Sequence, residues 1–337
     1  MRRATAGSNV DSWCLLIGAR LFAAALLAAA CMGAVQAQGF PSKPVRLLVG
    51  LPPGGGADVV ARVFASKLGE NLGQQVVVEN RAGAAGLLAA DSAAKSAPDG
   101  HTLLFGGVST NAIFASLYKK LPYDPVKDFV PISKIATFPL VLVVNKALPA
   151  DTLAEFIAYA RLNPGKMNYA SAGLGSPLHL TMEMLKARAG IDVVHVPYKG
   201  GVQALGDLLS GEIQVVFDAL PSQIENIRAG KVRALAITSK MRNAQLPEVP
   251  TMFEAGVADF EYLGWSAAFA PAGVPADVVA RLNAGIVAVL NLAATRERLA
   301  ELGVDAAPST PEQLAAFQRA EIERWAKIVK QSGAAVE

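Results

Sequence analysis

The sequence predicts an α/β protein with two domains, and three observations lead to this fold class. From residue 45 onward, apolar runs of strand length alternate with amphipathic stretches of helix length, and their periodicity tells the two apart. A second series of such units begins at Thr152. The apolar, β-prone segment Tyr262–Phe269 then precedes two long helical stretches, with no third series of strands. Strands that alternate with helices in this way favour right-handed crossovers and a parallel sheet.

The first series opens with a predicted strand over Val45–Val49, the glycine-rich stretch Pro52–Asp58 and a helix that begins at Val59. Apolar residues on one face of that helix indicate that it packs on the sheet. The later elements of this series are a strand over Val76–Glu79, a glycine turn over residues 80–86, an alanine-rich helix to about Ser96, and strands over Thr102–Phe105 and Leu140–Val144.

The second series begins with a helix that starts at the capping-box pair Thr152 and Glu155 and ends at Asn163. Its later elements are strands over Asn168–Ala170, Val193–Val196, Ile213–Phe217 and Val232–Thr238, and helices over Pro177–Ala189, Val202–Leu209 and Ser222–Ala229. The last two helices are predicted over Pro275–Thr295 and over Pro311–Lys330, the latter with Thr310 as its cap and Pro311 at its first position.

These elements group into a discontinuous first domain and an inserted second domain. Tyr262–Phe269 is expected to return the chain to the first domain, whose last helices cover its sheet. Two crossings between the domains, near residues 140–145 and 260–266, would then form a hinge. The predicted boundaries are 1–37 for a leader, 38–142 and 262–337 for domain 1, and 143–261 for domain 2.

The first 37 residues have the composition of a Sec signal peptide. Arginines precede an apolar run from Leu21 to Met32, and the ending Ala34-Val35-Gln36-Ala37 predicts cleavage after Ala37. That run, about twelve residues, is too short to span a bilayer. A lipoprotein anchor at Cys31 is the alternative, but the residue three positions upstream is the small Ala28. The mature protein is therefore expected in the periplasm.

Composition excludes several classes of function. Without the leader the chain has 28 basic and 27 acidic residues. This near-neutral balance lacks the excess positive charge that would attract the phosphates of a nucleic acid. Both cysteines, Cys14 and Cys31, lie in the leader, so the mature chain has no disulfide, thiol nucleophile or thiolate metal site. His101, His179 and His195 lack metal-site spacing. We expect neither a metal nor a cofactor.

The stretch Pro52–Asp58 is a candidate anion site, because it joins a strand to the start of a helix. Three consecutive glycines allow a ligand to approach the main chain closely, and helix N-termini attract anions. The spacing matches neither of the common phosphate-binding glycine motifs, and an ordinary flexible loop is the alternative. The candidate binding residues here are Gly54, Gly55, Gly56, Ala57 and Asp58.

A second loop, Ser171–Ser176, repeats this arrangement before the helix that starts at Pro177. Ser176 is the predicted N-cap, and Pro177 suits the first helical position. His179 lies on the first turn, where the helix dipole disfavours a cation, so we expect a neutral imidazole. It either faces a ligand or satisfies its own loop. The two loops are predicted to face each other across a cleft at the carboxyl ends of the strands.

Seven motifs occur in the order found in one known family. They are Pro53–Asp58, Glu79–Ala84, Pro98–Gly100, Tyr123–Phe129, Ala172–Ser176, Val196–Gly200 and Leu246–Thr251, the last followed by Glu254-Ala255-Gly256. From Lys43 to Lys330 the chain therefore resembles the Bug family, the periplasmic solute receptors of tripartite tricarboxylate transporters.

The resemblance implies a two-domain Venus-flytrap fold that closes on a small carboxylate, which is an amino acid, a di- or tricarboxylate, or an aromatic carboxylate. Main-chain and hydroxyl groups of the two loops would hold the carboxylate, partly through water. The remaining implied partner is the membrane part of the transporter, and the receptor is expected to be a monomer. The binding residues in the second loop would be Ser171, Gly173, Gly175, Ser176 and His179.

Specificity is expected to depend on the rest of the pocket. Leu51 stands where many family members have an aromatic residue. The sequence therefore does not predict the chemistry of the ligand beyond its carboxylate. His101 and His195 are expected to be structural. The candidate specificity residues are Ser109, Asn111, Tyr198, Lys199 and Asp218, the last at the end of its strand.

Two other functions are compatible with such a chain. One is a receptor that signals through a membrane sensor kinase. The other is a periplasmic ester hydrolase with Ser176 as nucleophile and His179 as base. Against the hydrolase, the loop lacks the G-x-S-x-G elbow, a capping serine is already occupied, and no third orienting acid is apparent.

Overall fold

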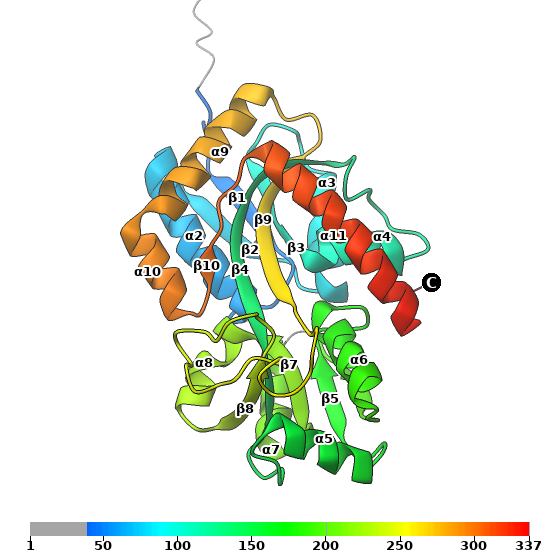
Figure 1. Cartoon of the computed structure of the whole chain (residues 1–337). Helices are drawn as coiled ribbons and strands as arrows, with labels where there is room; N and C mark the ends of the chain where they lie inside the picture. Colours follow the sequence, from blue (N-terminus) through cyan, green and yellow to red (C-terminus); the bar gives the residue numbers. More distant parts are fainter. Residues whose placement is uncertain (1–38, 200, 337) are drawn as a thin grey trace, which may run out of the picture. The chain divides into compact units, whose positions relative to one another are not determined.

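The computed structural model describes residues 39–199 and 201–336 (Figure 1). Lys43–Glu337 form one compact unit, separate from Met1–Ser42. The predicted signal peptide, including Cys14, Cys31 and the cleavage site after Ala37, lies outside the described residues.

Strands and helices follow one another largely as predicted. The strands are β1 (Val45–Val49), β2 (Val76–Asn80), β3 (Thr102–Gly107), β4 (Phe129–Asn145), β5 (Asn168–Ser171), β6 (Val194–Pro197), β7 (Val215–Ala219), β8 (Val232–Ile237), β9 (Leu263–Pro271) and β10 (Asp305–Ala306). The helices are α2 (Gly56–Leu72), α3 (Leu87–Ala94), α4 (Phe114–Leu117), α5 (Leu153–Leu162), α6 (Pro177–Ala189), α7 (Gly201–Ser210), α8 (Leu220–Arg228), α9 (Ala276–Asn291), α10 (Ala293–Glu301) and α11 (Pro311–Ser332), with short helical turns η1 (Ala84–Gly86) and η2 (Ser109–Ile113).

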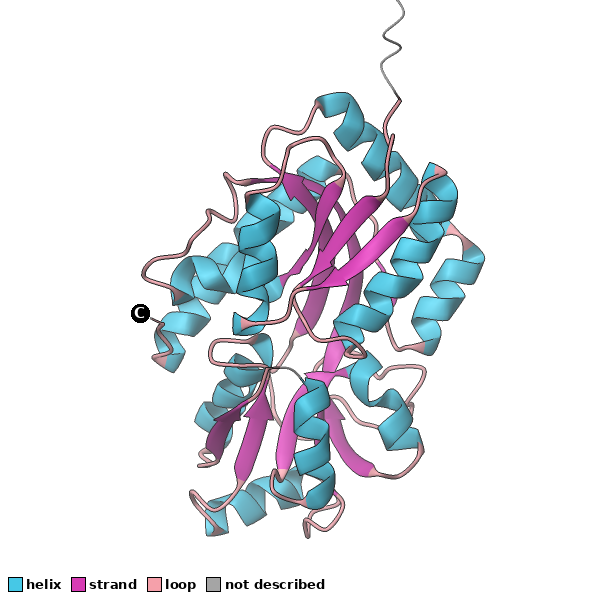
Figure 2. Cartoon of the chain, turned by 180° about the vertical axis from the view of Figure 1, so that it is seen from behind, coloured by secondary structure: helices cyan, strands magenta, loops and turns pink. Residues whose placement is uncertain are grey.

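The sheet is mixed, so the prediction of a parallel sheet was only partly right. β1 pairs in parallel with β2 and β3, and β5 pairs in parallel with β6 and β7. β9 is antiparallel to β3 and β4, and β4 is antiparallel to β7 and β8. Each parallel group comes from β-α-β units (Figure 2). β9 runs antiparallel to the first group at β3, and β4 runs antiparallel to the second group at β7.

β4 joins two groups of strands, which we call the first and second lobes. Its residues Phe129–Pro139 pair with β9 beside β1, β2, β3 and β10, the first lobe. Its residues Leu140–Asn145 pair with β7 and β8, in the second lobe with β5 and β6. The chain thus changes lobe at Pro139–Leu140, and it returns where β9 begins, at Leu263 (Figure 1).

The first half of β4 was missed by the sequence prediction, which began this strand at Leu140. Pro131 and Pro139 lie in that half, and proline normally argues against a central strand because it lacks a donor. The pairing with β9 shifts register between Pro131 and Ser133 and between Lys134 and Ala136. The first of these irregularities directly follows Pro131 and accommodates this proline in the ladder.

Helix starts follow the predicted caps. Thr152 and Thr310 both form capping boxes, and Ser176 caps α6 with Pro177 at its first position. The helix predicted over Pro275–Thr295 is instead divided into α9 and α10, because Leu292 between them is extended. No single described helix is long and apolar enough to cross a membrane; α9 and α10 pass that test only together, across a 69° bend.

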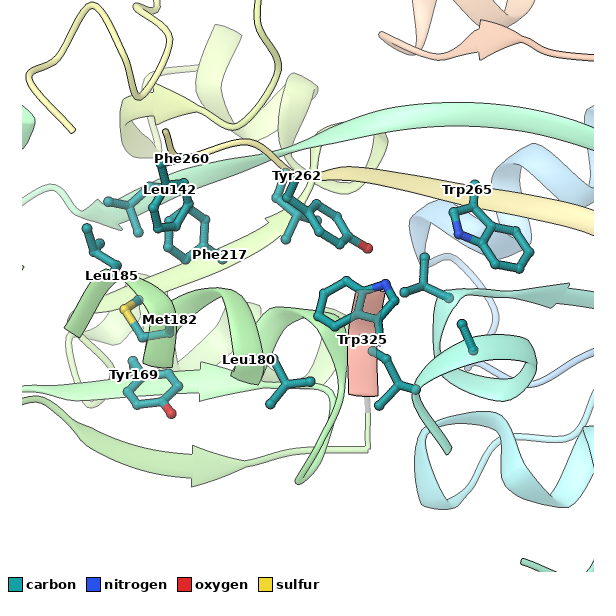
Figure 3. Packing of buried hydrophobic residues seen from close by; sticks show 14 of the residues in the cluster. Leu142, Tyr169, Leu180, Met182, Leu185, Phe217, Phe260, Tyr262, Trp265 and Trp325 are labelled. Atoms are coloured by element: carbon teal, nitrogen blue, oxygen red, sulfur yellow. The ribbon is translucent and has the colours of Figure 1, made fainter. Parts of the chain in front are cut away.

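One buried core runs along the strands from lobe to lobe (Figure 3). Tyr262, at the return crossing, packs edge-on against Trp325 of α11 at 5.8 Å between ring centroids. The indole nitrogens of Trp265 and Trp325 both donate to Glu321, at 2.9 and 3.2 Å. Helix α11 therefore holds the end of the return crossing in place.

Candidate ligand-binding cavity

A cavity lies between the two lobes, at the ends of their strands. Its space, counted with its open mouth, is ≈ 1120 Å³. It is lined from the first lobe by Val49, Gly50, Leu51, Pro52, Gly55, Gly56, Ala57, Val60, Ala85, Gly86, Leu104, Phe105, Gly106, Gly107, Val108, Ser109, Thr110, Phe138, Trp265 and Ser266, and from the second lobe and its return crossing by Leu140, Ala172, Ser176, Pro177, Leu178, Asp218, Ala219, Ser222 and Tyr262.

In the first glycine loop, Gly55, Gly56 and Ala57 line the cavity, whereas Gly54 and Asp58 do not. The Gly54 amide donates to Asp58 Oδ2 at 2.9 Å, and the Gly56 amide donates to Ser222 Oγ across the lobes at 2.9 Å. These two amides are therefore already paired within the protein. The other two lining residues of this loop are Gly55, the N-cap, and Ala57 in the first turn of α2. Amides at a helix start have no partner within the helix, so they can donate to a ligand.

Asp58 supports the loop from inside. Its carboxylate is 2% exposed and accepts hydrogen bonds from Gly54, Arg62 and Asn80. Burial alone would raise the pKa of this carboxyl, but the hydrogen bonds and the Arg62 charge outweigh it and lower the pKa. α2 begins at Gly56, three residues before the predicted start at Val59, so Asp58 lies within its first turn. The Asp58 side chain faces Arg62 and Asn80 and is absent from the cavity lining.

In the second loop, Ala172, Ser176, Pro177 and Leu178 reach the cavity. Ser176 Oγ accepts the His179 amide at 3.3 Å, as its capping role predicts. Of the predicted site residues here, the structure leaves Ser171, Gly173, Gly175 and His179 behind the lining.

The His179 imidazole is turned toward its own loop. Its Nδ1 accepts the Gly175 amide at 3.2 Å, which requires the neutral tautomer with its proton on Nε2. Burial lowers the pKa of His179, so the expected neutral imidazole agrees with both observations. Of the two predicted alternatives for His179, the structure therefore shows the one in which the imidazole hydrogen-bonds to its own loop and does not face a ligand.

A stack of three rings lies beneath that loop. His195 packs on Tyr169 and His179, with ring centroids 4.9 and 4.3 Å away. Its Nε2 lies 2.6 Å from Ser171 Oγ, which also accepts the Gly173 amide at 3.1 Å. Burial, followed by the neighbouring His179, lowers the pKa of His195 to about 4. His195 thus packs as expected and positions the loop through Ser171.

The specificity candidates divide in two. Ser109 and Asp218 line the cavity. Asn111 is fully buried and binds Thr110 Oγ1 at 2.7 Å, and the Tyr198 hydroxyl donates to Asp207 on α7. Asn111, Tyr198 and the exposed Lys199 are absent from the lining, so these three predictions were wrong. Protein partners hold the side chains of Asn111 and Tyr198. β7 also extends two residues beyond its predicted end, so that Asp218 is its penultimate residue.

Sequence reasoning missed most of the aromatic lining. Phe105, Phe138, Tyr262 and Trp265 surround the cavity from β3, from β4 and from the return crossing. Leu51 also lines the cavity. Although this residue is not aromatic, aromatic side chains from other elements line the same cavity. The position of Tyr262 and Trp265 in a predicted crossing was the one available signal, because a crossing must pass between the lobes.

A cavity between two lobes, with glycine loops and helix N-termini on both sides, defines a solute-binding receptor. The profile described as "Tripartite tricarboxylate transporter family receptor" matches residues 60–334, and the chain belongs to this family.

Relatives share nearly the whole chain. A protein of Pseudomonas sp. (strain P51), described as the "UPF0065 protein in tcbD-tcbE intergenic region", is 43% identical over 93% of this chain and 94% of its own. Protein BugT of Bordetella pertussis is 41% identical over 89% of this chain and 92% of its own. The structure of R. palustris Rpa4515 with adipate superposes with a TM-score of 0.85, at 36% identity, over 88% of this chain and 99% of that one.

Proposed function

We propose that the protein is a periplasmic receptor that captures a small carboxylate between its lobes and delivers it to a membrane transporter of the tripartite tricarboxylate type. The observation that carries this proposal is that one cavity is lined by the start of α2 from the first lobe and the start of α6 from the second. Family membership and the adipate bound by a relative support the same conclusion.

The carboxylate is held by main-chain amides rather than by a cationic side chain. Among the described lining residues none is Lys, Arg or His. Each helix N-terminus supplies about 0.3 to 1 kcal/mol toward an anion, and each hydrogen bond to a charged group about 1.5 to 3 kcal/mol. A few such contacts provide much of the roughly 8 kcal/mol of a micromolar complex.

Five predicted residues that reach the cavity are the direct binding residues in this proposal: Gly55, Ala57, Ser109, Ser176 and Asp218. Gly56 also lines the cavity, but its amide is paired with Ser222. Asp58 positions the first loop, and His179 with Ser171 positions the second.

Binding closes the lobes about Pro139–Leu140 and Tyr262–Leu263, the limits of the domains in this proposal. A ligand that touches both lobes favours the state in which they converge. Signalling through a sensor kinase would use the same closure, so only a partner experiment separates it from transport. An ester hydrolase is disfavoured, because His179 Nδ1 accepts from Gly175 and Ser176 Oγ accepts from the His179 amide.

The test is to identify the acid and then remove its charge. Small molecules released from the purified protein are identified by mass spectrometry, and the acid is titrated by calorimetry beside its primary amide. We expect the amide to bind at least roughly tenfold more weakly, a difference of about 1.4 kcal/mol. If the amide binds as tightly as the acid, the loops do not form an anion site.

A further inference from the structure

Ser266 lines the cavity from β9, the strand that runs between β3 and β4 (Figure 1). The residue is 4% exposed, and its Oγ has no hydrogen-bond partner among the described residues. A buried hydroxyl without a partner destabilises a protein, and most buried polar groups in native structures are paired. An unpaired hydroxyl in the wall of a binding cavity is therefore a candidate to contact a molecule that enters it.

The neighbours of Ser266 on the sheet explain why its hydroxyl is unpaired. In the two ladders of β9, Ser266 lies opposite Gly107 of β3 and Ala136 of β4. Residues that lie opposite each other in neighbouring strands point to the same face, and so do residues two apart on one strand. Gly264 and Ala268 are its neighbours along β9. None of these four residues has a polar side chain, so none of them can pair with the hydroxyl through a side chain.

Two aromatic rings flank this position along the sheet. Phe138 of β4 lies opposite Gly264, and a Cβ added to Gly264 would lie 2.5 Å from Phe138 Cε2, so the ring covers this glycine. Phe105 of β3 lies opposite Ala268, on the other side of Ser266. Both phenylalanines line the cavity. A hydrogen bond to Ser266 would therefore form between apolar rings, where it is stronger than in water.

The chemistry of the proposed ligand determines which way this hydrogen bond runs. A hydroxyl can both donate and accept, whereas an ionised carboxylate only accepts. Apart from the Trp265 indole, which donates to Glu321, the side-chain donors of the described lining are hydroxyl groups. β9 is paired on both of its edges, so the side chain is the part of Ser266 that can reach a ligand.

We propose that Ser266 is a ligand-binding residue whose hydroxyl donates a hydrogen bond to an oxygen atom of the bound carboxylic acid, between the rings of Phe105 and Phe138. This inference rests on the proposed function and adds to it a contact from the inner strand β9. The hydroxyl has no protein partner in the ligand-free receptor, and the acid supplies one. Ser266 therefore stabilises the complex and not the fold.

Replacing Ser266 by alanine separates these two effects. Calorimetry on the ligand-free mature receptor uses aspartate, adipate, malate, citrate and benzoate, which cover the expected classes of acid, and the acid that binds most tightly serves for the variants. Ser266→Ala should weaken its binding by tenfold or more, which corresponds to about 1.4 kcal/mol. The ligand-free variant should unfold at the wild-type temperature or above it, because the change removes a buried group that has no partner.

Thr295→Val is the matched control. Thr295 of α10 is 1% exposed, and its Oγ1 likewise has no hydrogen-bond partner in the part of the chain that the structure describes. The residue lies outside the cavity lining. This variant should also unfold at the wild-type temperature or above it, but it should keep the wild-type affinity.

Unchanged affinity in Ser266→Ala overturns the inference and leaves the receptor function standing. A ligand-free variant that unfolds at a clearly lower temperature, or that does not fold, overturns it as well, because the hydroxyl would then have a structural role. If none of the five acids binds, the carboxylic acid recovered from the purified protein takes their place in the same titrations. The proposed function fails separately, if the recovered molecule is not a carboxylate.

Discussion

Gly56 offers the clearest test of lobe closure, because its surroundings belong to both lobes. It is the first residue of α2, and its amide donates to Ser222 Oγ of α8 at 2.9 Å. A Cβ added at Gly56 would lie 2.8 Å from Ser222 Oγ and 3.1 Å from Pro221 Cγ. Both neighbours come from the second lobe, so Gly56→Ala crowds this contact between the lobes and leaves the first lobe itself unstrained.

The expected loss follows from overpacking, which costs about 1 to 3 kcal/mol. If the crowding is present only when the lobes are closed, the whole cost appears in binding. The dissociation constant for the identified acid should then rise by roughly 5- to 150-fold. Thermal unfolding of the ligand-free protein should change little, because alanine suits a helix better than glycine does.

The control is Gly206→Ala on α7, where an added Cβ meets no atom within 4 Å. It should leave affinity unchanged. Calorimetry gives the affinities, and small-angle scattering should show a smaller radius of gyration with ligand for the wild type and the control. Unchanged affinity in Gly56→Ala, with a normal unfolding temperature, would refute closure at this contact.

Three further predictions concern the second loop and the leader. Ser176→Ala removes a cap and a cavity hydroxyl, so binding should weaken by roughly tenfold in calorimetry and α6 should lose about 1 kcal/mol of stability; undiminished affinity would exclude the hydroxyl from the site. His195 has a folded pKa of about 4, below its unfolded value of 6.5, so the unfolded state binds more protons between these values. Stability should fall as pH drops from 6.5 toward 4, by at most about 3 kcal/mol, and His195→Gln should reduce that dependence in urea titrations; an equal slope in both proteins would contradict it. The secreted protein should begin at Gln38 by intact mass, and a diacylglyceryl adduct on Cys31 would show lipidation instead.

The sequence by itself determined the local features of this protein. The caps at Thr152, Ser176 and Thr310 were predicted correctly, because each depends on a side chain and an amide three residues away. The glycine loops before α2 and α6 were also placed, because glycine marks a turn within a few residues of sequence. Family membership also followed from the sequence, because its motifs keep their order along nearly the whole chain.

Only the tertiary structure decided which of the predicted site residues reach the cavity. Gly56 and Ser222 are 166 residues apart, yet they share a hydrogen bond across the lobes. Asn111 and Ser109 were both predicted as specificity residues. Asn111 is buried against Thr110, whereas Ser109 lines the cavity, and no local sequence pattern distinguishes the two.

The first half of β4 and the aromatic lining have the same explanation. Pro131 and Pro139 argue against a strand locally, and β9, more than a hundred residues later, supplies the pairing that makes one. Likewise Phe138 and Trp265 come together only because β4 and β9 cross between the lobes side by side. Local signals place helix caps and glycine turns, whereas long-range pairing and burial decide how far a strand extends and what each element faces.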